Sequence, residues 1–194
     1  MAQQVGVMKQ VIYLHKLKRE LDAAFAIDLR NLDASLVQMM FDWKAPSFAG
    51  GDRRKAMEVA DRLKAWHPVW GYLAEAKLLQ DEDPARTQKA LEQAGAADRS
   101  FYLAQVSLAE FYSKLPNRLP DAERLAQLCI QLDPDRAAGY GVLARVYAAQ
   151  QRYVDLDRIL NESERRDPDD LSPFYFAAKI LAARASDAGR AEQY

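Results

Sequence analysis

The chain has 194 residues, of which 49% are hydrophobic and 28% charged, a composition typical of one folded globular domain with a sizeable core. The formal net charge of −1 provides no long-range attraction for nucleic acid or for an anionic membrane surface, so neither is expected as a partner. No apolar run approaches the ~20 residues that a membrane-spanning helix needs, which excludes membrane insertion.

The N-terminus and the cysteine content bear on the cellular compartment. Residues Met1 to Gln4 lack the basic and apolar stretches of a secretory signal peptide, so the chain as written is expected in the cytoplasm. If a leader has been removed ahead of Met1, the expected compartment is the periplasm. Cys129 is the only cysteine, which precludes an intramolecular disulfide. It stands where a small packed side chain is expected, so we predict a buried thiol without a catalytic role.

Capping and helix-breaking residues divide the chain into about ten expected helices, starting with one over residues 3–27, and leave little room for strands. The stretches between the breaks carry apolar residues at helical spacing, such as the stripe of Leu36, Met39, Met40 and Trp43. Asp83 and Ser172 each precede a proline and are expected to cap the helices that follow. The expected breaks lie at 31–33, 45–52, 67–68, 81–84, 98–100, 116–120, 133–136, 150–152 and 167–173.

The break at 45–52 is unusually long and contains Gly50 and Gly51 ahead of three cations. Glycines at a helix start can hold a phosphate through backbone N–H groups. However, the stretch follows no strand, and Asp52 places a carboxylate where the anion would bind. We therefore expect a turn that ends in an Asp52 helix cap.

A short pattern recurs at a fixed interval of 35 residues and predicts the architecture. It reads Leu73-Ala74-Glu75-Ala76-Lys77, then Leu108-Ala109-Glu110-Phe111-Tyr112, then Leu143-Ala144-Arg145-Val146-Tyr147. A period in this range is typical of two-helix units that bury their apolar faces against their neighbours. The fold class predicted is all-α, an α-solenoid of antiparallel helix pairs.

These residues resemble the tetratricopeptide repeat (TPR) family, whose unit carries W-x2-L-G-x2-Y in its first helix and a proline after its second. The match is best over 137–168, where Tyr140, Leu143, Ala144 and Tyr147 are followed by Pro168. The resemblance extends over about residues 11–185 and is weakest at the start. It implies one TPR-like domain over 1–194, divided into an N-terminal helix at 1–28, helix-pair repeats at 29–68, 69–99, 100–134 and 135–168, and a terminal helix with a tail at 169–194.

The resemblance also implies a function, which is a protein-interaction scaffold that binds a peptide or protein in the concave groove lined by the first helices of the repeats. Relatives that clamp a C-terminal carboxylate use lysines and asparagines in this groove, whereas this chain has no asparagine there and two acids. The expected groove residues, with mixed apolar and charged side chains, are Val37, Phe41, Lys44, Glu75, Val106, Glu110, Lys114, Val142, Arg145, Tyr175 and Lys179.

Other functions remain as alternatives. A ligand-carrying or assembly subunit of a larger bacterial transport system would contain an enclosed apolar pocket, whereas a peptide scaffold would present an open charged groove. An RNA-binding helical repeat is disfavoured because it needs a basic groove. With two histidines and scattered carboxylates, we expect neither an enzyme nor a metal or other cofactor.

Overall fold

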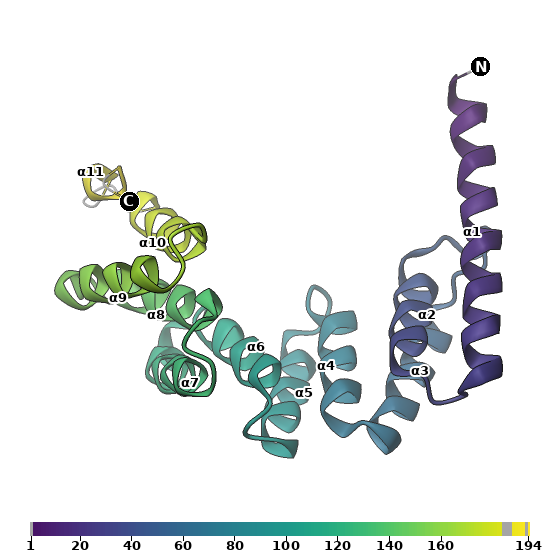
Figure 1. Cartoon of the computed structure of the whole chain (residues 1–194), viewed down its shortest axis with the longest axis horizontal. Coiled ribbons are helices and arrows are strands. Elements are labelled where there is room, and N and C mark those ends of the chain that lie inside the picture. Colours follow the sequence, from purple (N-terminus) through teal and green to yellow (C-terminus); the bar gives the residue numbers. More distant parts are fainter. Residues whose placement is uncertain (1, 184–187, 193) are drawn as a thin grey trace. The chain divides into compact units, whose positions relative to one another are not determined.

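The computed structural model describes residues 2–183, 188–192 and 194, over which the chain is helical without a strand, as the all-α prediction requires (Figure 1). Helices that are neighbours in sequence pack against each other, for example in the pairs α2–α3 and α7–α8. The helices are α1 (Ala2–Ile27), α2 (Leu32–Lys44), η1 (Ser47–Ala49), α3 (Arg53–Trp66), α4 (Pro68–Leu79), α5 (Pro84–Ala97), α6 (Tyr102–Tyr112), η2 (Pro116–Arg118), α7 (Leu119–Leu132), α8 (Ala137–Ala149), α9 (Tyr153–Arg166), α10 (Ser172–Ala182) and α11 (Ala188–Ala191).

The chain divides into two compact units, one up to Ala94 and the other from Gly95 onward, so that the division falls within α5. In the first unit α3 packs against both α2 and α4. In the second unit α8 contacts α6, α7, α9 and α10. The expected repeat boundaries at 28, 68, 99, 134 and 168 all lie at or near breaks between helices. The expectation of a single domain stays a prediction.

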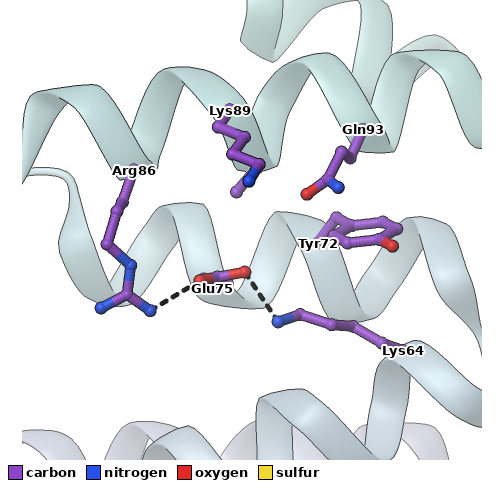
Figure 2. Close-up of a pocket in the computed structure, with 7 residues that line it drawn as sticks. Lys64, Tyr72, Glu75, Arg86, Lys89 and Gln93 are labelled. Carbon is purple, nitrogen blue, oxygen red and sulfur yellow. Dashed lines mark hydrogen bonds and ion pairs between the residues drawn. The ribbon is translucent and has the colours of Figure 1, made fainter.

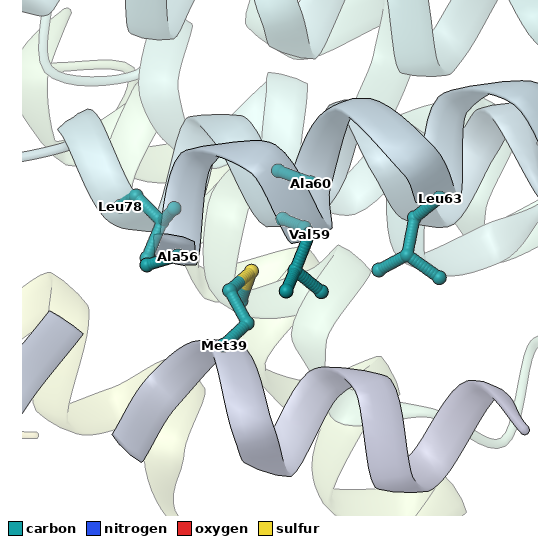
Figure 3. Close-up of a cluster of buried hydrophobic side chains, with 7 residues drawn as sticks. Met39, Ala56, Val59, Ala60, Leu63 and Leu78 are labelled. Atoms are coloured by element: carbon teal, nitrogen blue, oxygen red, sulfur yellow. The ribbon is translucent and has the colours of Figure 1, made fainter. Parts of the chain in front are cut away.

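The core of the first unit forms where α2, α3 and α4 meet (Figure 3). Met39 of α2 is 2% exposed and points toward α3, where Ala56, Val59 and Leu63 are buried. The other members of the predicted α2 stripe, Leu36, Met40 and Trp43, are partly buried and pack around this cluster. Small side chains at Ala56, Ala60 and Ala74 allow the helices to approach closely.

The junction between α3 and α4 consists of His67 alone, and it requires a glycine in the next helix. The backbone N–H of Gly71 donates a hydrogen bond to the His67 carbonyl at 2.9 Å, in the first turn of α4. A methyl group on Gly71 would lie 2.2 Å from the backbone nitrogen of Lys64, closer than any allowed contact. Glycine therefore lets α4 fold back directly against the end of α3.

Helix α8 is the centre of the second unit and is buried on nearly every side. Tyr140, Leu143, Ala144 and Tyr147, the residues of the best-matched repeat, are all at most 3% exposed. Ala144 itself is fully buried, as expected for a position where helices pack closely. Gly141 serves the contact with α10, because a methyl group there would come within 3.0 Å of the Phe176 ring.

Two residues 35 apart in sequence tie the starts of α6 and α8 to the turns before them. The Tyr140 hydroxyl donates a hydrogen bond to the Pro134 carbonyl at 3.0 Å. At the equivalent position in α6, the Gln105 side-chain amide donates to the carbonyls of Asp98 at 3.2 Å and Gly95 at 3.0 Å. Both side chains donate to carbonyls in the last turn of the preceding helix or within two residues after it, where the helix itself supplies no donor.

Two of the three predicted helix caps are confirmed, and one is wrong. The Asp52 carboxylate accepts hydrogen bonds from the N–H groups of Arg54 at 3.0 Å and Lys55 at 3.3 Å, so the turn at 45–52 ends in a cap. Asp83 accepts from the N–H of Arg86 at 3.0 Å. Ser172 is not a cap because it lies inside α10, and its own N–H donates to the Asp170 carboxylate at 2.9 Å.

Helix α1 spans the expected N-terminal helix and is the longest in the described structure. On it, Leu21 is 6% exposed, whereas Ile27 at its end is 90% exposed. Neither α1 nor another helix in the described ranges combines the length and apolar character needed to cross a membrane.

Candidate functional site

The first unit contains an open pocket of about 450 Å³ between α4 and α5, with the end of α3 at its edge (Figure 2). Glu75 of α4 lies at its centre, and Lys64 and Arg86 point toward this carboxylate from opposite directions. Lys89 and Gln93 extend from α5 toward α4. The lining residues are Lys64, Tyr72, Glu75, Arg86, Lys89, Ala90 and Gln93.

Two features of the sequence form this pocket: the helical spacing of residues on α5, and the glycine that lets α4 approach α3 closely. Arg86, Lys89, Ala90 and Gln93 follow the spacing i, i+3, i+4, i+7 and therefore share one face of α5. Ala90 is 1% exposed and packs beneath the longer side chains. On the opposite wall, the close contact of Gly71 with α3 brings Lys64 beside Tyr72 and Glu75.

Each oxygen of the Glu75 carboxylate has its own cation. Lys64 Nζ lies 2.7 Å from Oε2, and Arg86 Nη2 lies 2.9 Å from Oε1. Burial of Glu75 opposes its ionisation, but the hydrogen bonds from Lys64 and Arg86 outweigh this and hold the pKa of Glu75 below its usual value. Burial likewise opposes the charge on Lys64, yet hydrogen bonds to Asp61 and Glu75 raise the pKa of Lys64.

Lys89 adds a charge that has no counterpart in the pocket. Its side chain is exposed, and it forms no ion pair with any residue that the structure describes. Lys64, Arg86 and Lys89 face Glu75 within the lining, and Asp61 pairs with Lys64 at 2.8 Å from outside it, so these three cations and two carboxylates leave a surplus of one positive charge. Such a lining attracts anionic groups and repels cationic ones.

The second unit holds a partly buried cation at Arg145 on α8. Its Nη1 donates a hydrogen bond to Ser113 Oγ at 3.0 Å, and its guanidinium lies 4.5 Å from the centre of the Phe176 ring on α10. Burial lowers the pKa of Arg145, and the nearby Glu110 charge opposes that shift. Within the described ranges Arg145 forms no ion pair, either with Glu110 or with another residue.

The expected groove residues divide into exposed, partly exposed and buried positions. Val106 and Val142 are 5% and 2% exposed, so their assignment to an accessible groove is wrong. Helices α6 and α8 are covered by their neighbours, which leaves these valines in the core. Phe41 is half-buried next to Gly50, and Glu75 lies in the pocket. Glu110 and Arg145 are partly exposed, and the exposed members are Val37, Lys44, Lys114, Tyr175 and Lys179.

The sequence interpretation found Glu75 but missed the cations around it. Lys64, Arg86 and Lys89 lie on α3 and α5, the second helices of their expected repeats, whereas the groove projection used first helices alone. The spacing of Arg86, Lys89 and Gln93 on one helix face was an available signal. The link to Glu75 was not available, because it depends on how α3, α4 and α5 pack.

Two other kinds of site receive no support in the part of the chain that the structure describes. Within those ranges, no three or more His, Cys, Asp or Glu side chains gather as metal ligands would. Cys129 is fully buried, and this burial raises the pKa of its thiol to about 12.

No protein-family model matches this sequence, and no curated protein is significantly similar to it. Function is therefore inferred from the geometry of the two sites.

Proposed function

We propose that this chain is a protein-interaction scaffold of the tetratricopeptide-repeat type, which binds a peptide or protein on the face formed by its first helices. The alternative, a ligand-carrying or assembly subunit of a bacterial transport system, calls for an enclosed apolar pocket. The pocket at Glu75 is open, and so is a smaller one of about 280 Å³ that Gln38, Asp42 and Arg62 help to line. Both are lined mainly by charged and polar side chains, which favours a scaffold.

The environment of Arg145 is the observation that carries the proposal. A guanidinium held against an aromatic ring and a hydroxyl, and paired with no carboxylate among the described residues, is preorganised to bind an incoming anionic group. Tyr175 and Lys179, both exposed, extend from the neighbouring helix α10. Arginine and tyrosine are among the residue types enriched where binding energy concentrates at protein interfaces.

Charge reversal tests this surface. Peptides that bind the immobilised wild-type chain are first selected from a random display library, and their affinities are then measured for the double variant Arg145→Glu/Lys179→Glu. We expect at least a tenfold loss, because reversal removes the attraction and adds repulsion, as expected for close charge pairs. The matched control is Arg124→Glu/Arg158→Glu, which makes the same charge change on exposed side chains of α7 and α9 in the same unit.

Two results oppose the proposal. Equal affinities of both double variants would exclude the Arg145 surface as the binding site. Loss of helicity by circular dichroism in the Arg145→Glu/Lys179→Glu variant alone would instead assign these side chains a structural role.

A further inference from the structure

We propose that the pocket formed by Lys64, Arg86 and Lys89 binds the carboxylate side chains of an acidic peptide segment, with Glu75 as the positioning residue. This inference rests on the proposed function in that the ligand is a peptide. It concerns a different unit and different residues, however, so the two sites are tested separately.

The pocket presents several hydrogen-bond donors around one carboxylate. Glu75 uses one oxygen for Lys64 and one for Arg86, which holds the two cations on opposite sides of this carboxylate (Figure 2). Arg86 contacts Glu75 through Nη2 alone, and its side chain is 53% exposed, so other guanidinium N–H groups remain available. Lys89 lies one turn further along the same face of α5. Its charge is available to a ligand, because it forms no ion pair with a residue that the structure describes.

The charges that line the pocket select the sign of the ligand's charge. A cationic group would have to compete with Lys64 and Arg86 for Glu75 while facing Lys89, which leaves it repelled. A carboxylate is instead attracted, because it accepts charge-assisted hydrogen bonds from Lys89 and Arg86 and neutralises the surplus positive charge. Glu75 therefore orients the cations, and its own charge is already matched.

The dimensions of the pocket bear on the size and shape of the ligand. At about 450 Å³ the pocket falls within the range for organic ligands and exceeds what one inorganic ion fills. It is also open, which lets a peptide backbone pass across it while side chains enter. Tyr72 and Gln93 add a ring and an amide at the end of the pocket away from Arg86, and these groups are suited to pack against and hydrogen-bond a peptide.

A defined probe tests the inference. Fluorescence anisotropy of a labelled eight-residue Gly-Ser peptide with two adjacent glutamates is measured against the full chain, alongside the same peptide with glutamines in their place. We expect the glutamate peptide to bind at least tenfold more tightly. Lys89→Glu is expected to weaken it at least tenfold, because a close attraction becomes a repulsion. Lys77→Glu makes the same charge change at an exposed lysine of α4 outside the pocket, and we expect less than a twofold effect.

Zero-length carbodiimide coupling locates the bound carboxylate. A glutamate that pairs with a lysine is expected to form an amide with Lys89 or Lys64, identifiable by mass spectrometry. Coupling only to lysines outside the pocket, or equal binding of the glutamate and glutamine peptides, would overturn the inference. Equal weakening by Lys89→Glu and Lys77→Glu would do the same, because it would indicate a general charge effect.

Two further comparisons separate this inference from its nearest alternatives. Inorganic phosphate that displaces the peptide, where sodium chloride of equal ionic strength does not, would reassign the pocket to small anions. The Arg145→Glu/Lys179→Glu variant is expected to bind the glutamate peptide within twofold of wild type. If that variant loses its display-selected ligands but keeps this peptide, both proposals hold. If instead Lys89→Glu leaves glutamate-peptide binding unchanged, the pocket alone is excluded.

Discussion

The hydroxyl of Tyr102 on α6 accepts a hydrogen bond at 3.2 Å from the backbone N–H of Gly139, the third residue of α8. This N–H is one of the donors at a helix start that have no partner within the helix. The residue before α8, Arg136, provides no side-chain cap, and its guanidinium instead lies 4.8 Å from the centre of the Tyr102 ring. A side chain from α6 thus caps the start of α8.

Removing the Tyr102 hydroxyl should therefore destabilise the fold. We expect Tyr102→Phe to lower the free energy of unfolding by about 0.5–1.5 kcal/mol, because the Gly139 N–H loses its partner. Urea unfolding followed by circular dichroism measures the change. Tyr175→Phe removes a hydroxyl from a side chain that is 60% exposed and serves as the control. Identical midpoints for the two variants would show that the hydrogen bond does not stabilise α8.

Ala144 provides a test of close packing in the second unit. Its side chain is fully buried on α8, so Ala144→Leu forces three more heavy atoms into a filled site. We expect a loss of about 1–3 kcal/mol in the free energy of unfolding. Ala96→Leu makes the same change at an exposed position of α5, where an effect below about 0.5 kcal/mol is expected. Equal shifts in the denaturant midpoint would contradict the assignment of Ala144 to the core.

Gly71 tests the short junction between α3 and α4. In Gly71→Ala the new methyl group would meet the Lys64 backbone at 2.2 Å, so the helices must separate. We expect the unfolding free energy to fall by about 1–3 kcal/mol or more. At Gly189 on α11 an added methyl meets nothing within 4 Å, and Gly189→Ala should be neutral or stabilising by up to about 1 kcal/mol. Thermal midpoints that rise for both variants would refute the close approach.

Glu75 gives the fold a defined dependence on pH. Its pKa in the folded chain lies below the ordinary value of 4.5, so the unfolded chain binds a proton more readily. The stabilisation of the fold by ionised Glu75 is complete above about pH 4.5. It is lost as the pH falls through the lower pKa that Glu75 has in the folded chain. At pH 7, Glu75→Gln should cost about 1–2 kcal/mol, a value reduced by the exposure of Arg86.

Urea unfolding of wild type and Glu75→Gln between pH 7 and pH 3 measures this dependence. The difference in unfolding free energy between wild type and Glu75→Gln should be constant down to about pH 5 and then shrink. Glu20→Gln alters an exposed ion pair with Arg19 and should have an effect below about 0.5 kcal/mol throughout. A difference that grows toward acid would mean that the pKa of Glu75 is raised.

Cys129 should resist thiol reagents in the folded chain. Its thiol is fully buried, and its pKa of about 12 leaves almost no thiolate at pH 8. We expect reaction with an aromatic disulfide reagent to be at least about a hundredfold slower in buffer than in denaturant, where the pKa returns to about 8.5. Rates within tenfold of each other would place Cys129 on an accessible surface.

The helices were predictable from the sequence because their ends carry local chemistry. Asp52 and Asp83 cap the helices that they were expected to cap, and both bond only to residues two or three positions away. Ser172 was assigned wrongly because Asp170, two residues earlier, competes for the same turn. Local rules do not decide between neighbouring caps when both are polar.

The candidate sites were less predictable because they depend on contacts between helices. Val142 carries the repeat spacing of a groove residue, yet it is buried in the crowded α8. The spacing of Lys89 places it on one face of α5 with Arg86 and Gln93, but its proximity to the Glu75 ion pairs follows only from how the helices pack. Sequence spacing identifies the face of a helix but not the helices that cover it.

The hydrogen bonds of Gln105 and Tyr140 bear on how such a repeat can be recognised. A glutamine amide and a tyrosine hydroxyl, 35 residues apart, both donate to carbonyls in the last turn of the preceding helix or just after it. This position therefore requires a side chain that is long enough and carries a hydrogen-bond donor. Residues of unrelated shape, such as glutamine and tyrosine, can replace each other there while the turn is kept. A sequence comparison counts the replacement of glutamine by tyrosine as a mismatch. Repeats of this kind can therefore lose detectable sequence similarity while the structure of their turns is retained.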